Sequence, residues 1–283
     1  MISKRAILVS VSVSLWKARQ YDRNIAEEVN IKYKSQKAGN YIKILIDQPE
    51  LKEISNIAQR ARKFLEEHSL PWDDRVWRII PAEKYNEIVG ELKEFRDEFN
   101  DAVQEFIGKY DVIVNIREPA RLKDMYDRDE YPDATTVESR YAFNIGVKPI
   151  PEEGDFRVDV ENETIQEMEE MMLEEQERQK KRAASGIYSR LIKVLEKMVD
   201  RLSDHNKIIR KSVVQNIVDV CNEIPELNSV IQDDDITEMS REVQKRVGYF
   251  TTDMLKDDLE ARERALTEAR KLLKEIKERI MVE

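Results

Sequence analysis

The feature that most constrains the fold is a long amphipathic stretch over residues 81–110. Apolar side chains recur there at alternating steps of three and four, which places them on one stripe of a helix, while charged residues fill the other faces. The pattern predicts a helix of about eight turns. Its aromatic side chains need cover, either from elsewhere in the chain or from a second chain. The candidate partner-interface residues on this stripe are Tyr85, Leu92, Phe95, Phe99 and Phe106.

The composition indicates a chain that is mostly helix. Charged residues make up 37% of the 283 residues, and only seven glycines and eight prolines occur. The net charge of -10 argues against indiscriminate nucleic-acid binding by the whole chain, although it leaves a local basic face open. Cys221 is the single cysteine, so no internal disulfide can form, and a reducing compartment is the simplest setting.

The longest strongly apolar run covers residues 6–15 and is far shorter than the roughly 20 residues that span a bilayer. A signal peptide is the rival interpretation, because Lys4 and Arg5 precede the run. The alternation of apolar residues with serine over residues 7–16 instead favours a strand with one buried face. The sequence therefore predicts a soluble protein of the cytoplasm.

The remaining pattern predicts a mainly α protein with a small β element. Besides the strand at 7–16, residues 141–160 are typical of a hairpin that turns at 151–154. Helical periodicity and its breaks predict helices at 22–33, at 51–67, at 164–203 with a weak point at 183–186, at 208–223 ending before Pro225, and from 233–235 to about 282.

The distribution of aromatic residues predicts two domains. Of the 20 aromatic residues, 17 lie before residue 161, and aromatic side chains supply large buried areas. We therefore expect an α-rich N-terminal domain with a small sheet over residues 1–160. Residues 161–283 should form long antiparallel helices, as a hairpin or a bundle.

No spacing in the sequence indicates catalysis, a cofactor or a metal. His68, His205 and Cys221 are each isolated, and we expect them at the surface or at helix ends. The serines at 10, 12 and 14 lie on a strand face without a nucleophile elbow, and no glycine-rich phosphate loop occurs. An enzyme would need an active site built from carboxylates that are distant in sequence.

Two acidic clusters have a metal-binding and a structural interpretation. Residues 233–235 could bind magnesium or calcium, but a helix N-terminus with Asp235 as cap and Glu238 in a capping box is favoured. The second cluster is interleaved with basic residues and therefore predicts a solvated loop. Its acidic members are Glu118, Asp124, Asp127, Asp129 and Glu130.

A basic helical face is the feature best suited to nucleic acid. Spacings of three and four place its first four members on one side of a helix, where they could neutralise phosphates. Interspersed acidic residues such as Glu196 and Asp200 leave open the alternative of ordinary charge pairs. The nucleic-acid candidates are Arg190, Lys193, Lys197, Arg201, Lys207, Arg210 and Lys211.

Three strings in order resemble an uncharacterised protein family of bacteriophages and integrative mobile elements. They are VSVSLW followed by Arg19 and Asp22, then PAEKYNEIVGELKEFRDEFNDAVQEFIGKYD, then YAFNIGVKPIPEEGDFRV. The resemblance covers roughly residues 6–160. Members are often encoded near a MoxR-type AAA+ ATPase and a von Willebrand A-domain protein. The resemblance implies an ATPase-associated adaptor in the host cytoplasm, with no catalytic residues.

Two functional hypotheses follow. The first is a non-enzymatic interaction protein, an adaptor or structural component that binds a protein partner or copies of itself through helical surfaces. The second is a nucleic-acid-binding factor that uses the basic face around residues 190–211.

Overall fold

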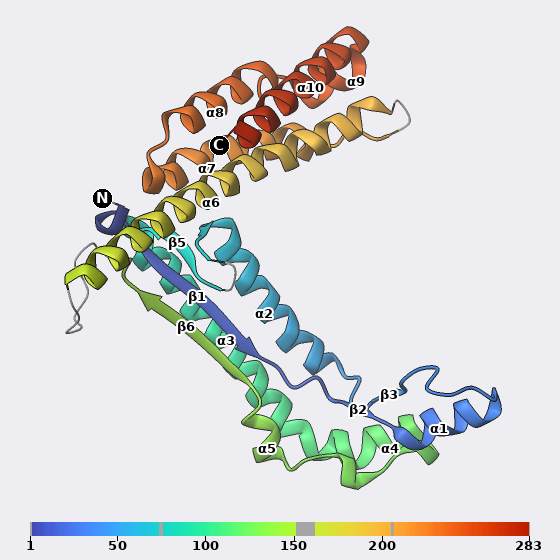
Figure 1. The fold of residues 1–283 in the computed structure, drawn as a ribbon. Coiled ribbons are helices and arrows are strands. Elements are labelled where there is room, and N and C mark those ends of the chain that lie inside the picture. The colour runs from blue at the N-terminus through green and yellow to red at the C-terminus, as the bar shows by residue number, and fades with distance from the viewer. Residues whose placement is uncertain (1, 74–75, 151–161, 205–206, 283) are drawn as a thin grey trace. The chain divides into compact units, whose positions relative to one another are not determined.

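The computed structural model describes residues 2–73, 76–150, 162–204 and 207–282 (Figure 1). It is mostly helical with small antiparallel sheets, which confirms the predicted fold class. The helices are α1 (Arg23–Lys32), α2 (Pro49–Glu67), α3 (Tyr85–Val112), α4 (Glu118–Leu122), α5 (Ala134–Glu138), α6 (Asn162–Ser203), α7 (Ser212–Ile231), α8 (Asp234–Val247), α9 (Thr252–Asp257) and α10 (Leu259–Val282).

The strands form two sheets. They are β1 (Ala6–Ser14), β2 (Arg19–Tyr21), β3 (Ile42–Ile44), β4 (Leu70–Pro71), β5 (Arg78–Pro81) and β6 (Ala142–Lys148). One sheet has the order β4-β5-β1-β6, and β2 pairs with β3 in the other. The predicted strand at 7–16 is confirmed as β1, and β6 is the first strand of the predicted hairpin. The rest of that hairpin and the predicted boundary at residue 160 lie outside the described residues.

Residue contacts divide the chain into two compact units, each assembled from separate segments. Unit 1 comprises residues 1–10, 66–88 and 147–283, and unit 2 comprises residues 11–65 and 89–146.

The core of unit 1 lies along the predicted seam of α6. Helix α6 packs against α7 and α10, and α7 packs against α8. The helix runs without a break through the predicted weak point at 183–186. There α6 approaches β4 closely: a Cβ at Gly186 would lie 2.8 Å from Pro71 Cδ, so the site needs glycine. The fully buried seam residues are Tyr188, Leu191, Leu195, Met198 and Leu202.

The predicted end of a helix before Pro225 is wrong, because Pro225 lies inside α7. Proline has no backbone N–H and leaves the carbonyl four residues earlier without its helical donor. In this helix that carbonyl belongs to Cys221, and it accepts a hydrogen bond of 3.4 Å from the Ser240 hydroxyl on α8. A long-range side chain therefore accommodates the proline.

The predicted single helix from 233 to 282 is also wrong, because α8, α9 and α10 divide this stretch. Asp233, not Asp235, is the cap of α8 and accepts hydrogen bonds from the N–H groups of Asp235 and Ile236. Thr251 caps α9, and Asp258 accepts from Ala261 N at the start of α10. Each cap starts a new helix by satisfying its free N–H groups.

The aromatic stripe of α3 is covered largely by unit 2 itself. Leu92, Phe99 and Phe106 are buried. The Phe99 ring lies 5.6 Å from that of Phe143, and Phe106 packs against Trp16 and Tyr141. Phe95 is half-buried and contacts the ring of Phe64 at 5.9 Å. Tyr85, at the start of the helix, is half-buried. The chain thus supplies the cover that the stripe requires.

Candidate functional site

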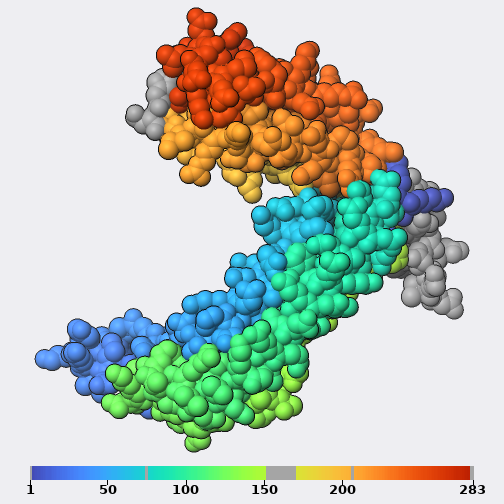
Figure 2. All heavy atoms as spheres, turned by 180° about the vertical axis from the view of Figure 1, so that it is seen from behind, coloured from blue at the N-terminus to red at the C-terminus, as the bar shows by residue number. Residues whose placement is uncertain are grey.

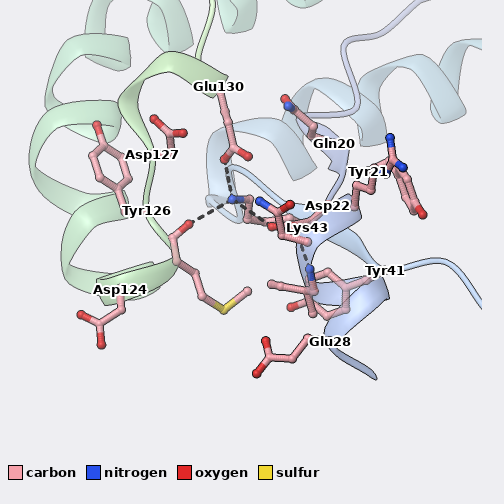
Figure 3. Close-up of a pocket in the computed structure, with 14 residues that line it drawn as sticks. Gln20, Tyr21, Asp22, Glu28, Tyr41, Lys43, Asp124, Tyr126, Asp127 and Glu130 are labelled. Atoms are coloured by element: carbon pink, nitrogen blue, oxygen red, sulfur yellow. Dashed lines mark hydrogen bonds and ion pairs between the residues drawn. The ribbon is translucent and has the colours of Figure 1, made fainter. Parts of the chain in front are cut away.

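The candidate site is a pocket of about 810 Å³ in unit 2, which we call the Lys43 pocket. It is formed where β2, β3 and the start of α1 lie beside the segment 124–130, and the two views of the molecule place these segments together (Figures 1 and 2). Its lining combines carboxylates with tyrosines (Figure 3). The lining residues used below are Tyr21, Asp22, Glu28, Tyr41, Lys43, Asp124, Tyr126, Asp127 and Glu130.

The pairing of β2 with β3 sets the orientation of Lys43. The strands are antiparallel, with Gln20 opposite Lys43 and Tyr21 opposite Ile42. Successive side chains of a strand point to opposite faces. In β3 the usual burial of apolar residues and exposure of charged residues is reversed. Lys43 is only 5% exposed, whereas Ile42 is 57% and Ile44 is 42% exposed. The strand therefore buries its charged residue and presents its apolar residues to solvent.

The Lys43 ammonium group lies among two carboxylates and one main-chain carbonyl. It lies 2.6 Å from a Glu130 carboxylate oxygen, 3.4 Å from Asp22, and donates to the Met125 carbonyl at 3.1 Å. Burial opposes the charged form, but the hydrogen bond and negative charge of Glu130, reinforced by Asp22, outweigh it and raise the pKa of Lys43. A lysine that acts as nucleophile or base needs a lowered pKa. The pKa of Lys43 is shifted in the opposite direction, so its ammonium group stays charged between the two carboxylates.

Asp22 joins the pocket to α1. Its side chain caps the helix by accepting a hydrogen bond from Ile25 N at 3.1 Å, and its own N–H donates to the Tyr41 carbonyl at 2.9 Å. The backbone hydrogen bond from Ile25, opposed by burial and helped by Lys43, lowers the pKa of Asp22. The Asp22 carboxylate therefore both caps α1 and pairs with the Lys43 ammonium group.

A second buried network holds the end of β3. Arg121 pairs with Glu118 and donates to the carbonyls of Ile44 and Leu45 at 2.7 and 3.0 Å. Glu118 is fully buried and accepts from Gln48 Nε2 at 2.9 Å. The prediction that this acidic cluster is a solvated loop is therefore wrong for Glu118, and also for Glu130, whose side chain is 15% exposed. Glu118 also pairs with nearby Arg121, but Gln48 and Lys43 lie far away in sequence.

The open part of the pocket carries negative charge on the carboxylates of Glu28 and Asp124. Within the described ranges, no ion pair satisfies Glu28 or Asp124. Tyr21, Tyr41 and Tyr126 also contribute aromatic rings to the lining of the pocket (Figure 3). Carboxylates attract a cation by charge, and the face of an aromatic ring attracts it through its quadrupole. The arrangement suits a cationic side chain of a ligand.

Exposed apolar side chains are concentrated in the segment 21–44, which also supplies residues of the Lys43 pocket. Of the 17 large apolar residues that are exposed in the described structure, seven fall between residues 21 and 44. We call these seven residues the apolar surface: Tyr21, Val29, Ile31, Tyr33, Tyr41, Ile42 and Ile44. Sequence reasoning missed them, although the apolar–polar–apolar triplet at 42–44 is a period-two signal for a strand.

The structure separates the predicted nucleic-acid residues. Arg190 donates to the carbonyls of Glu66, Glu67 and Ser69 at the end of α2, and burial lowers its pKa. Lys207 pairs with Asp200 at 2.7 Å. Lys193 and Lys211 are exposed. The other three line a separate basic pocket in unit 1: Lys197, Arg201 and Arg210.

The remaining candidates have structural positions. His68 is exposed just after α2, as expected, whereas His205 lies outside the described residues. The expectation of a surface or helix-end position for Cys221 is wrong, because this residue is buried and lies well inside α7. Among the residues that the structure describes, no group of three or more His, Cys, Asp or Glu side chains could hold a metal ion. In the same residues no helix is both long and apolar enough for a membrane span.

Comparison with known proteins gives a family assignment. No curated protein and no solved structure matches the chain. The profile of the DUF3150 family, described as "Protein of unknown function", matches residues 3–224, which include the Lys43 pocket, the apolar surface and the basic pocket. Because this match covers most of the sequence, the chain belongs to the DUF3150 family.

Proposed function

We propose that this protein is a non-enzymatic adaptor that binds another protein through the apolar surface and the Lys43 pocket of unit 2. The observation that carries the proposal is the burial pattern of strand β3, which exposes Ile42 and Ile44 and buries Lys43 among carboxylates. Exposed apolar patches that border polar groups are typical of protein-interaction sites. The buried ion pairs keep this strand in an orientation that its apolar residues alone would not favour.

The pocket defines the chemistry of the partner. Glu28 and Asp124 supply negative charge, and Tyr41 and Tyr126 supply aromatic faces. A matching protein surface presents apolar side chains around an arginine or lysine. Charge pairs at an interface speed association and set specificity, while burial of apolar area supplies much of the affinity.

The resemblance to proteins of bacteriophages and mobile elements supports one candidate partner. A MoxR-type AAA+ ATPase is encoded beside many members of the family that the sequence resembles. An adaptor of this kind would act in the host cytoplasm and would link the ATPase to its target. Self-association through the apolar surface is the competing use of the same residues.

The test uses the full-length protein and a MoxR-type AAA+ ATPase from the same genome. Light scattering on the protein alone first determines whether it self-associates. Binding to the ATPase is then measured by biolayer interferometry for the wild type and for Ile31→Ser/Ile42→Ser, whose parent residues are 78% and 57% exposed. The expected result is a loss of affinity of about tenfold or more, because both substitutions remove apolar side chains that the proposed interface would bury.

A matched control removes equally exposed apolar residues elsewhere. Met171→Ser/Leu259→Ser changes two side chains in unit 1 that are 68% and 65% exposed. This variant should bind like the wild type. The proposal fails if the wild type is a monomer that binds no ATPase, or if both double variants lose affinity equally.

A further inference from the structure

Unit 1 contains a second pocket whose chemistry is opposite to that of the Lys43 pocket. The basic pocket has a volume of about 270 Å³ and lies between the end of α6 and the start of α7. This is below the roughly 300–1,000 Å³ of sites for drug-sized ligands, so the pocket suits a small group. Its lining residues are Val194, Lys197, Asp200, Arg201, Ile208, Arg210, Ser212, Val213 and Asn216.

Three cations of the pocket are available to a ligand. Lys197 and Arg201 are one helical turn apart on α6, and Arg210 precedes α7. No ion pair of these three side chains is present in the described part of the chain. This arrangement contrasts with Arg190, whose guanidinium is occupied by main-chain carbonyls.

The acidic residue of the pocket is already neutralised. Asp200 accepts a hydrogen bond from Lys207 at 2.7 Å, and this hydrogen bond, with the charges of Lys207 and Arg201, lowers the pKa of Asp200. Glu196, on the same helix, pairs with Lys277 at 2.7 Å. The three cations therefore create a local positive charge in a chain whose net charge is -10.

The neutral lining adds hydrogen-bonding and apolar groups. The Ser212 hydroxyl and the Asn216 amide lie on the first turns of α7, where the positive end of the helix dipole also favours an anion. Ile208 is 72% exposed beside them and offers an apolar wall. Arginine is especially suited to phosphate because its planar fork matches two oxygens at once.

We infer that the basic pocket binds a phosphate group, presented either by a nucleic-acid strand or by a free phosphate. Lys197, Arg201 and Arg210 neutralise the phosphate oxygens, and Ser212 and Asn216 donate hydrogen bonds to them. This inference is independent of the adaptor proposal, because it concerns other residues in the other unit.

The test compares two probes on the full-length protein. Fluorescence anisotropy measures binding of a labelled oligothymidine at several salt concentrations, and ³¹P NMR titration measures binding of inorganic phosphate. In the variant Lys197→Gln/Arg201→Gln/Arg210→Gln, we expect a loss of affinity of about tenfold or more. If the oligonucleotide is the ligand, the slope of log affinity against log salt also falls in magnitude by about 0.7, because the pocket holds one phosphate and each lost phosphate contact of a single strand contributes about that much.

A control variant with the same change in net charge distinguishes a pocket from a general basic face. Lys193→Gln/Lys211→Gln/Lys245→Gln alters three exposed lysines outside the pocket and should bind like the wild type. As a second pocket variant, Asn216→Asp keeps the side-chain shape but adds a negative charge, so it should also weaken binding. Circular dichroism confirms that each variant is folded.

Each outcome decides the question. Oligonucleotide binding that is lost only in the two pocket variants supports the inference and identifies nucleic acid as the source. Inorganic phosphate binding that is lost only in these variants supports it with a small phosphate as the source. The inference is overturned if the wild type binds neither probe, or if the pocket and control variants lose the same affinity.

Discussion

Lys43 and Glu130 come from distant parts of the chain, yet their ammonium and carboxylate groups lie 2.6 Å apart in the interior of unit 2. Replacement of Lys43 by methionine preserves much of the side-chain volume but leaves Glu130 and Asp22 without their cation. Removal of one partner from a buried ion pair typically costs about 3–5 kcal/mol, so we expect Lys43→Met to lower the free energy of unfolding by about 3 kcal/mol. Urea unfolding followed by circular dichroism measures this change.

The control for that experiment is Lys52→Met. Lys52 pairs with Asp47 at 3.3 Å, but its side chain is 71% exposed. An exposed pair contributes about 0–1 kcal/mol, so this variant should unfold almost like the wild type. Equal effects of the two substitutions would show that the buried position of Lys43 does not matter.

The raised pKa of Lys43 predicts a loss of stability at alkaline pH. For a lysine whose folded pKa is raised, the contribution to stability is complete below the unfolded pKa of about 10.4 and is lost as the pH rises through the folded pKa. The difference in unfolding free energy between the wild type and Lys43→Met should therefore stay constant from about pH 7 to 9 and shrink above about pH 10.4. A difference that grows with pH in this range would contradict the prediction.

Two helical glycines should respond to alanine in opposite ways. At Gly108 in α3 a Cβ meets no atom within 4 Å, so Gly108→Ala should stabilise the protein by up to about 1 kcal/mol. At Gly186 the same Cβ would lie 2.8 Å from the stiff ring of Pro71, so Gly186→Ala should destabilise it by about 1–3 kcal/mol. Thermal unfolding of both variants provides the measurement. Stabilisation by both would mean that α6 does not approach β4 as closely as described.

Arg262 on α10 should stabilise the C-terminal end of α6 by hydrogen bonding to its main-chain carbonyls. It is buried and donates to the carbonyls of Leu202 and Asp204 at 3.2 and 2.8 Å. Arg262→Met removes these donors from buried carbonyls and should cost about 2 kcal/mol of unfolding free energy. Arg264→Met, an exposed position on the same helix, is the control and should change stability by less than about 0.5 kcal/mol. Chemical denaturation distinguishes the two outcomes.

Much of the helical fold could be predicted because it depends on local periodicity. The predicted helices at 51–67 and 164–203 correspond to α2 and α6, since α2 carries an apolar stripe along its length and α6 carries one from Ala183 to Leu202. The error at Pro225 has a different origin. Its consequence for the helix depends on Ser240, a residue of another helix, and single-sequence patterns contain no signal for that contact.

The candidate site was harder to predict for the same physical reason. Glu118 and Glu130 lie in a segment where acidic and basic residues alternate, which is normally typical of solvated chain. Glu118 is buried and Glu130 is largely buried, and each contacts a residue from a distant segment, Gln48 and Lys43 respectively. For the basic face, the helical spacing could be read from the sequence. The hydrogen bonds from Arg190 to main-chain carbonyls of residues 66–69 could not, because they join distant segments.

The division of unit 1 among three separate segments affects the order in which the protein can fold during synthesis. Unit 2 has all its residues once residue 146 has left the ribosome, whereas unit 1 waits for the C-terminal helices. At elongation rates of about 5–20 residues per second, synthesis of the remaining 137 residues takes about 7–27 seconds. Throughout it, apolar residues such as Leu8, Leu70 and Ile79 have no completed core, so a chaperone that shields them should raise the yield of the folded protein.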